Sequence, residues 1–224
     1  AEPWSGNPAP RVHGTPAGMI NSVGLQNPGI DSWINNDLPA LIDHGARVVA
    51  SIWGKSVAEY REAATRLAGI DGIVAVEVNV SCPNLEEKGD MFSHAPDTCR
   101  LAIEASLVAG LPLWAKLSPN VTDIVPIARA ALDGGAEALT LTNTVLGMVI
   151  DPETRRPVLG SGGGGLSGPA MRPVSVRAVF DVYAALGPVP IVGVGGVTAA
   201  EHVAEFMIAG ASAVQVGTAH FADP

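Results

Sequence analysis

The segment NVSCPN, at residues 79–84, places a thiol between two amides at the end of the apolar run GIVAVEV. A run without polar alternation is typical of a buried parallel strand, and Pro83 favours its end at this point. A thiol in the loop after a strand can move a proton, although its ordinary pKa of about 8.5 leaves only a minority as thiolate at neutral pH. Cys82 is therefore a candidate base, and a small apolar residue is the alternative interpretation.

Other polar residues also stand at the ends of apolar runs. Lys116 follows LPLWA, so it either points inward toward an anion or acceptor or lays its stem along a rim. Amides both donate and accept, so several together suit a ligand with alternating C=O and N–H edges, such as a pyrimidine dione. Each amide could instead be a turn residue. The residues in question are Asn21, Asn79, Asn84 and Asn143, with Ser51, Ser118 and Thr144 also at strand ends.

Glycine turns follow the last two apolar runs, at Gly195–Gly196 and at Gly217–Thr218. Exposed backbone N–H groups in such turns can bind a phosphate, and the final two strands of a barrel are a common place for that site. A turn that merely satisfies steric limits is the alternative. Two such turns in succession favour a phosphate site.

These candidates are carried by short β-branched runs that alternate with amphipathic patterns. The predicted strands are residues 46–53, 73–80, 111–118, 137–144, 189–196 and 212–219. The predicted helices are residues 56–69, 97–110, 123–135, 174–187 and 199–210, and the first has a Ser cap with Glu59 three residues later. A hairpin or loop is expected at 11–29, a glycine-rich loop before the fourth helix, and a mobile lid at 85–97.

Regular strand and helix repeats predict an α/β fold with a parallel sheet, either open and doubly wound or closed as a (β/α)8 TIM barrel. The regular spacing favours the barrel. Six strands are two fewer than a barrel needs, so we expect the first two to precede Ala1. Residues 1–224 are then a single barrel domain that is incomplete at the N-terminus and at the C-terminus.

Composition narrows the class of partner. The 224 residues are 47% hydrophobic with a formal net charge of −9 and no basic cluster, which excludes nucleic acid or an anionic membrane as the main partner. No apolar run approaches the roughly 18 residues that span a bilayer. Cys82 and Cys99 form no disulfide framework and no metal-ligand cluster. A soluble cytoplasmic protein that binds a small metabolite is predicted.

Seven segments together resemble the class 1 dihydroorotate dehydrogenases, FMN-containing enzymes of pyrimidine synthesis. They are GMINSVGLQNPG, NVSCPN, WAKLSPNVTDI, LTNT, GGGGLSGPAMRPVSV, PIVGVGGV and AVQVGTA. Class 2 enzymes carry serine where Cys82 stands, and CPNLEEKGDMF is similar to subclass 1B. The resemblance implies oxidation of (S)-dihydroorotate to orotate by a homodimer. It also implies a heterotetramer with a subunit that carries FAD and an iron–sulfur cluster and passes electrons to NAD.

The resemblance also implies residue roles. Cys82 would remove the proton from C5 of dihydroorotate while the hydride passes from C6 to FMN. The substrate would be held by Asn21, Val23, Gly24, Leu25, Asn84, Asn143 and Thr144. FMN would be held by Ser51, Asn79, Lys116, Gly168, Gly195, Gly196, Gly217 and Thr218, although subclass 1B relatives often have asparagine where Ser51 stands.

The sequence departs from the family pattern at its ends. The family has two further strands before this point, the second ending in a Lys-Ser motif that contacts FMN and substrate, and a helix after the last strand. We therefore expect the 224 residues to be part of a longer chain. Three other functions stay open: a pyrimidine reductase like a domain of dihydropyrimidine dehydrogenase, a flavin-free phosphate-binding lyase or isomerase, and an inactive scaffold.

Overall fold

The computed structural model describes residues 2–81 and 91–223. The chain divides into two compact units. The first unit comprises residues 1–3 and 28–140, and the second unit comprises residues 4–27 and 141–224.

The first unit is built on parallel strands. They are β3 (Val48–Ile52), β4 (Ile73–Asn79), β5 (Leu113–Leu117) and β6 (Ala138–Leu141), and Leu141 already belongs to the second unit. Neighbours in the chain are neighbours in the sheet, and β3 pairs with β4, and β4 with β5, in parallel. Parallel pairing between consecutive strands requires a crossover, which the helices supply.

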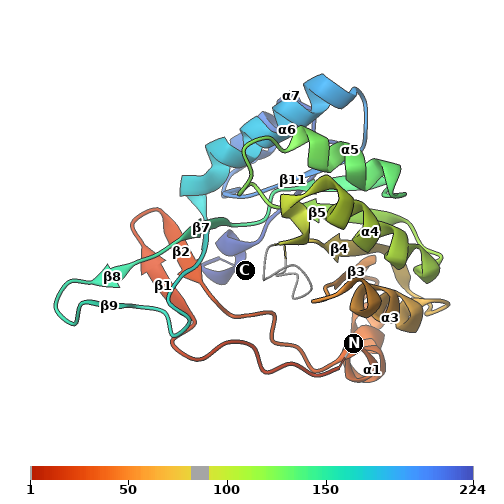
Figure 1. Cartoon of the computed structure of the whole chain (residues 1–224), viewed down its shortest axis with the longest axis horizontal. Coiled ribbons are helices and arrows are strands. Elements are labelled where there is room, and N and C mark those ends of the chain that lie inside the picture. Colours follow the sequence, from red (N-terminus) through yellow and green to blue (C-terminus); the bar gives the residue numbers. More distant parts are fainter. Residues whose placement is uncertain (1, 82–90, 224) are drawn as a thin grey trace. The chain divides into compact units, whose positions relative to one another are not determined.

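Three helices of the first unit pack along these strands: α3 (Val57–Leu67), α4 (Pro96–Ser106) and α5 (Val125–Asp133) (Figure 1). Short 3-10 turns, η3 (Phe92–His94) and η4 (Leu107–Ala109), flank α4. The predicted Ser cap of α3 is confirmed, because the Glu59 backbone N–H donates to Ser56 Oγ at 3.3 Å. The Glu59 carboxylate in turn accepts from the Lys55 backbone N–H at 2.8 Å, one residue earlier than in a standard capping box.

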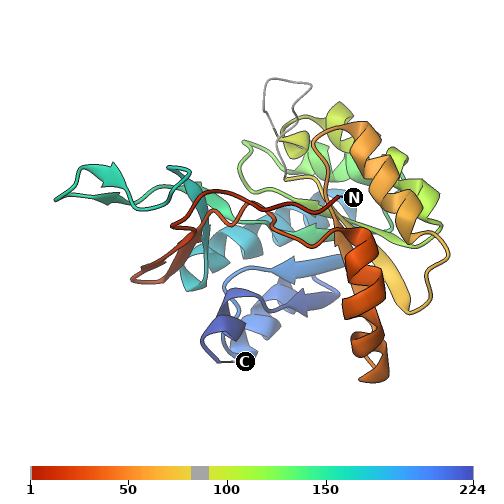
Figure 2. The same ribbon diagram turned by 90° about the horizontal axis from the view of Figure 1, so that it is seen from below.

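A helical run between residues 30 and 43 was not predicted. It consists of α1 (Ile30–Ser32), the π-helical turn η1 (Trp33–Asp37) and α2 (Leu38–Asp43), which Figure 2 shows as one continuous run. Its sequence contains two asparagines, three aspartates and a proline, all of which favour turns when read locally. Contacts within the unit hold it in place, including an ion pair of 3.0 Å between Asp31 and Arg66 on α3.

The second unit contains the last two predicted strand and helix repeats. Strand β11 (Ile191–Val194) pairs in parallel with β12 (Ala213–Gln215), and the helices are α6 (Arg172–Leu186) and α7 (Ala200–Ala209). The 3-10 turns η5 (Pro169–Met171) and η6 (Thr218–Phe221) complete it. All six strands and five helices that the sequence predicted are therefore present in the described residues, and the α/β class is confirmed.

An antiparallel sheet in the second unit corrects one prediction. The expected hairpin is present as β1 (Val12–Thr15) and β2 (Gly18–Asn21), but β10 (Gly164–Ser167) and β7 (Val145–Gly147) extend it in the order β1-β2-β10-β7. The predicted glycine-rich loop thus contributes two strands, and a small hairpin of β8 (Ile150–Asp151) and β9 (Arg156–Pro157) projects between them (Figure 1). Glycine has low strand propensity, so only pairing with β2 reveals β10.

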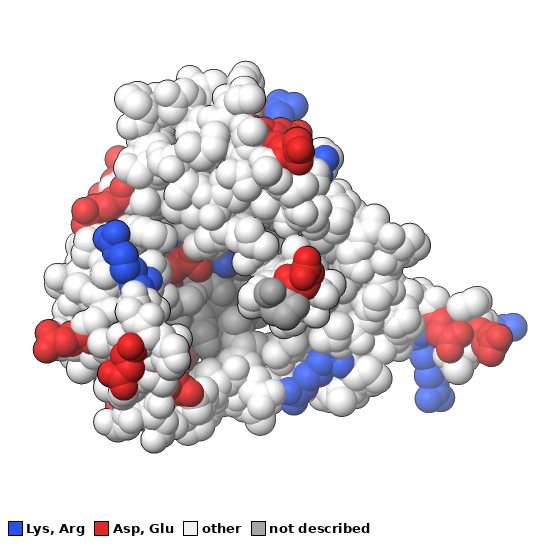
Figure 3. All heavy atoms as spheres, turned by 180° about the vertical axis from the view of Figure 1, so that it is seen from behind, with Lys and Arg blue, Asp and Glu red and all other residues white. Residues whose placement is uncertain are grey.

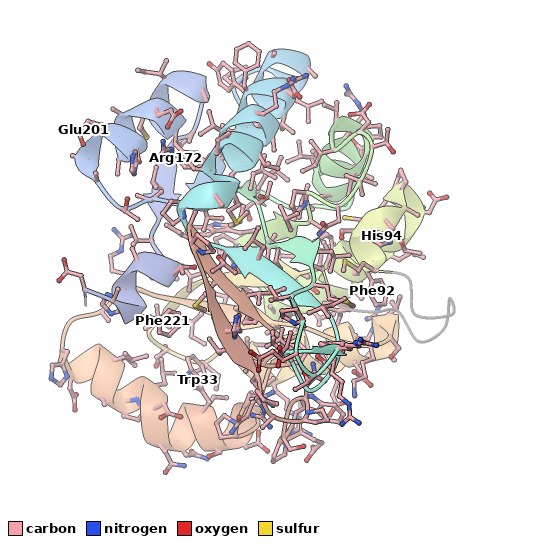
Figure 4. All side chains as sticks on the ribbon, turned by 90° about the vertical axis from the view of Figure 1, so that its left-hand side faces the viewer. Trp33, Phe92, His94, Arg172, Glu201 and Phe221 are labelled. Atoms are coloured by element: carbon pink, nitrogen blue, oxygen red, sulfur yellow. The ribbon has the colours of Figure 1, made fainter. Side chains whose placement is uncertain are left out.

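The predicted mobile lid is wrong for the residues that the structure describes. Phe92 and Ser93 are fully buried, and the Ser93 backbone N–H donates to the Val80 carbonyl oxygen at 2.9 Å. The Phe92 ring meets the buried ring of Tyr60 edge to face, with 5.1 Å between centroids. Phe92 and His94 lie just before α4 (Figure 4), and His94 is exposed. Residues 85–90 of that prediction lie outside the described part.

Candidate active site

The strands of the first unit have one apolar face and one polar face. Alternate side chains of a strand point to opposite faces. On one face Val76, Val78, Ala115, Leu117 and Leu139 are completely buried. The other face carries the polar side chains Ser51, Glu77, Asn79, Lys116 and Thr140.

The strand register gathers the polar side chains of β4 and β5. Asn79 lies opposite Lys116, and Glu77, two residues earlier on the same face, lies opposite Ser51 of β3. Asn79 and Lys116 are at the carboxyl ends of their strands, where barrel enzymes place their catalytic groups. The structure therefore brings three predicted residues together, of which Ser51 is exposed and Asn79 is buried.

Glu77 is the one charged residue of this face that sequence reasoning missed. Its side chain is only 6% exposed, and its Oε1 lies 3.4 Å from Lys116 Nζ. Its Oε2 accepts a hydrogen bond of 2.9 Å from the hydroxyl of Thr140, which is completely buried. Of the two orientations that the sequence left open for Lys116, the structure shows the inward one, with a carboxylate as its partner. The sequence did contain a signal for Glu77, because it is a carboxylate within an apolar run and stands two residues before Asn79.

Asn79 and Ser118 are both held by local hydrogen bonds. The Asn79 carbonyl oxygen accepts from the Tyr60 hydroxyl at 2.7 Å, and its Oδ1 accepts from the Ser81 backbone N–H at 3.2 Å. Ser118 is buried, and its Oγ accepts from the Asn120 backbone N–H at 3.1 Å and side-chain amide at 2.8 Å. The side chain of Ser118 therefore shapes the turn after β5.

Cys82 and Asn84 lie outside the described residues, so their roles stay predictions. The other cysteine, Cys99, is buried on α4 and is free. Burial raises the pKa of its thiol to about 12 from an ordinary 9.0, because the thiolate would lose its hydration. Such a thiol is inert at neutral pH.

The second unit contains two of the four predicted amides, Asn21 and Asn143, together with Thr144. Asn21, the last residue of β2, donates from Nδ2 to the Gly165 carbonyl oxygen at 3.3 Å. Thr144 is held by its backbone N–H, which donates to Asn143 Oδ1 at 2.8 Å. The Thr144 side chain fills the space that a Cβ at Gly165 would need, so glycine is required at that position of β10.

The backbone at residues 23–25 is engaged within the second unit. The Val23 carbonyl oxygen accepts from the Asn7 backbone N–H at 3.0 Å, and that of Gly24 accepts from Trp4 Nε1 at 2.9 Å. The Leu25 carbonyl oxygen accepts from Asn27 Nδ2 at 2.8 Å. These bonds fix the segment's conformation, so the groups expected to face the substrate start from a rigid loop.

The glycine turn after β11 lies against the start of α6. Gly196 has a φ of +73°, and a Cβ there would lie 2.8 Å from the Gly168 carbonyl oxygen and 2.8 Å from Arg172 Cβ. Arg172, the first residue of α6, faces α7 (Figure 4), where its Nε lies 2.9 Å from Glu205 Oε2. Three predicted glycines, Gly168, Gly195 and Gly196, thus surround a long helix's N-terminus, which attracts anions.

The turn after β12 is more open. Gly217 has no atom within 4 Å of the position of an added Cβ, and Thr218 begins η6. The backbone at this turn is therefore accessible to a ligand within its own unit, and a side chain at Gly217 would meet no protein atom.

Other surfaces offer less chemistry. A groove of about 710 Å³ between α6 and α7 is apolar and includes none of the predicted residues. The projecting β8–β9 hairpin carries acidic and basic side chains together (Figure 3), so it presents no basic patch. Within residues 2–81 and 91–223, no three His, Cys, Asp or Glu side chains cluster as metal ligands. No helix of that part is long and apolar enough to cross a bilayer.

Comparison with known proteins gives a consistent result. A family model described as dihydroorotate dehydrogenase matches residues 1–224. The protein "Dihydroorotate dehydrogenase B (NAD(+)), catalytic subunit" of Desulforudis audaxviator is 51% identical over the whole chain, which covers 73% of that protein. Proteins of the same name from Halalkalibacterium halodurans and Geobacillus kaustophilus are 47% identical, with 73% and 71% of their lengths covered.

These matches agree with the predicted subclass 1B, and the family match agrees with the predicted barrel class. They extend over both units and over all of the segments that carry the resemblance. The chain belongs to the dihydroorotate dehydrogenase family.

Proposed function

We propose that this chain is the catalytic subunit of an NAD-linked dihydroorotate dehydrogenase that oxidises dihydroorotate to orotate in pyrimidine synthesis. The observation that carries the proposal is the polar face of the first unit. It places Asn79 and Lys116 opposite each other at strand ends, and Cys82 follows Asn79 by three positions in the sequence. In a chain of this family, that arrangement suits a redox cofactor next to a base.

FMN is the proposed cofactor, and the residues present fit it. The turn at Gly196 admits no side chain, and α6 begins beside it, so backbone N–H groups and a helix N-terminus can receive a phosphate. Gly168, Gly195, Gly217 and Thr218 complete the proposed phosphate site. Ser51, Asn79 and Lys116 would hold the ring, which accepts the hydride when FMN is bound.

The chain's own residues would bind and deprotonate the substrate. Asn21, Asn143 and Thr144, with the rigid backbone of residues 23–25, would hold the pyrimidine ring and its carboxylate, together with Asn84. Cys82 would take the proton from C5 as thiolate. A loop held by its own hydrogen bonds limits the movement of a ring that is bound to it.

The proposed partners follow from the relatives' printed name, which describes them as catalytic subunits. We expect a homodimer that joins a second subunit carrying FAD and an iron–sulfur cluster into a heterotetramer. That subunit would pass the electrons to NAD. The free thiol of Cys99 is consistent with a reducing cytoplasm, which is the location proposed.

Anaerobic mixing of the purified protein with dihydroorotate tests the proposal. Bound flavin absorbs near 450 nm and should bleach with dihydroorotate, and NAD should restore the colour only when the second subunit is present. Dihydrouracil serves as the matched substrate that lacks the carboxylate. Bleaching by dihydrouracil but not by dihydroorotate would favour the pyrimidine reductase, and a colourless protein that takes up no FMN would favour the flavin-free barrel. Neither the family description nor the relatives' names point to these alternatives.

A further inference from the structure

A buried carboxylate lies beneath the lysine proposed to contact FMN. Glu77 stands in the middle of β4, and its side chain is only 6% exposed. An ionised carboxylate at such a position is costly unless it is paired and hydrogen-bonded. An apolar residue there would pack without that cost, so a glutamate needs a reason other than stability.

Both oxygens of this carboxylate are engaged by different neighbours. Oε2 accepts from the buried Thr140 hydroxyl at 2.9 Å, and Oε1 faces Lys116 Nζ at 3.4 Å. A hydroxyl donor on one oxygen fixes the plane of the carboxylate and thereby the position of the other oxygen. Thr140 therefore holds Glu77 in the orientation that meets the lysine.

The strand register places this contact on the inner side of the lysine. Lys116 lies opposite Asn79, but its ammonium reaches back to Glu77, two residues nearer the amino end of β4. The lysine side chain is 24% exposed and that of Glu77 is 6% exposed. The ammonium of Lys116 is therefore the more exposed group of the pair, on the side of the strand ends, and the carboxylate of Glu77 is the more buried one.

We infer that Glu77 is a positioning residue for Lys116, which fixes the ammonium in place and balances its charge against the redox cofactor. The inference rests on the proposed binding of FMN. A cation near the flavin ring stabilises the reduced form, which carries additional negative charge. Glu77 offsets part of that effect. Lys116, Glu77 and Thr140 together therefore set how readily the cofactor accepts electrons.

The test is the reduction potential of the bound flavin in Glu77→Gln. Glutamine keeps the size of the side chain and can still accept from Thr140, but it cannot balance Lys116. The ratio of reduced to oxidised flavin against a reference dye should rise about tenfold, which is about 30 mV for a two-electron couple. A residue with only a structural role would change thermal stability and leave this ratio unchanged.

Glu104→Gln is the matched control. Glu104 lies on α4, is paired with Arg100 at 2.7 Å and is 40% exposed, so the same chemical change there should leave the flavin potential as in the parent. Glu77→Asp is the rescue variant, because it restores the negative charge and should return the ratio to within about threefold of the parent.

Thr140→Val provides a second test if Glu77→Gln does not fold or does not retain FMN. Valine preserves the shape of threonine and removes only the hydroxyl, so Glu77 would be held less firmly and would balance Lys116 less well. The same ratio should rise by about threefold. A potential equal to or below the parent's in a folded, flavin-containing Glu77→Gln or Thr140→Val would overturn the inference. A parent protein that binds no FMN would instead overturn the proposed function.

Discussion

The two units offer a ligand opposite kinds of chemistry. The first unit presents side chains: Lys116 is paired with Glu77 on the same strand face, and the Asn79 side chain is held by the Ser81 backbone N–H. The proposed site in the second unit is made of backbone: a Cβ at Gly196 would meet the Gly168 carbonyl oxygen and Arg172, so only glycine fits this turn. Removing a side chain from the first unit should leave the ligand bound. Adding a side chain at Gly196 in the second unit should prevent binding, because the new atoms would meet the protein. A change in the first unit should therefore slow the reaction without loss of flavin, and a change in the second unit should cause loss of flavin.

Cys82→Ala should produce the largest effect and should leave cofactor binding intact. Loss of a general base slows the step by about 10²- to 10⁴-fold, so flavin reduction by dihydroorotate should slow by that amount. Stopped-flow absorbance near 450 nm measures the rate, and the flavin content per chain measures binding. Cys99→Ala is the control, because Cys99 is buried on α4. An unchanged rate in Cys82→Ala would remove that residue from the role of base.

Gly196→Val should produce the opposite result, a folded protein that has lost its flavin. The new side chain would meet the Gly168 carbonyl oxygen and Arg172 at a backbone φ of +73°. We expect flavin content to fall at least about tenfold. Gly187→Val is the matched control in the same unit, because its φ is +79° but an added Cβ would meet no atom within 4 Å. It should lose stability from the same backbone strain and keep its flavin.

A Gly196→Val protein that retains flavin as fully as Gly187→Val would contradict the phosphate site. Circular dichroism must show that both variants are folded, because flavin is also lost on unfolding. The pair of glycine variants thus separates strain in the backbone from occupation of the site.

The sequence predicted the repeating scaffold better than the contacts inside it. The six parallel strands could be predicted because each is a continuous apolar run, and the five helices because their apolar residues recur at helical spacing. Strand β10 could not be predicted, since its residues GGLS have little strand propensity and form a strand by pairing with β2 and β7. The helical run at 30–43 was missed because its residues favour turns when read locally and only Leu38 among them is buried, so no periodic apolar face marks it.

In the candidate site, too, single residues could be predicted from the sequence but their contacts could not. Lys116 could be predicted because a lysine after an apolar run needs a partner at a strand end. Glu77 and Thr140 could not, because their contact joins residues 63 positions apart and depends on the register of strands. Alternate residues of a strand lie on the same face, so counting back two positions from Asn79 would have placed Glu77 on the polar face. It would not have identified its partners.

Cys99 allows the apolar face of the first unit to be tested without touching the site. The pKa of its thiol is about 12 in the folded protein, whereas the ordinary value, which applies to the unfolded chain, is 9.0. Above pH 9 the unfolded chain therefore loses a proton that the folded chain keeps. The free energy of unfolding should therefore fall by about 1.4 kcal/mol per pH unit between pH 9 and pH 12, with no effect below pH 9. Urea titrations from pH 8 to pH 10.5 measure it.

Cys99→Ala is the comparison for that pH dependence. The variant should be less stable at pH 7, because a buried group has been removed, and its stability should fall less steeply above pH 9. Parallel slopes for the parent and the variant would show that Cys99 does not hold its proton in the folded protein. Flavin reduction at pH 7 should be the same in both.

Ser56→Ala should produce the smallest effect and no change in either proposed site. Ser56 caps α3 by accepting from the Glu59 backbone N–H, on the helix layer that packs behind the strands. Loss of an N-cap costs about 0.5–2 kcal/mol, so urea denaturation should show that decrease in the free energy of unfolding. Ser56→Asp is the control, because aspartate also caps helices and should restore most of the stability. If Ser56→Ala instead altered the flavin potential, the helix layer would be coupled to the polar face, and the separation of scaffold from chemistry in the first unit would be wrong.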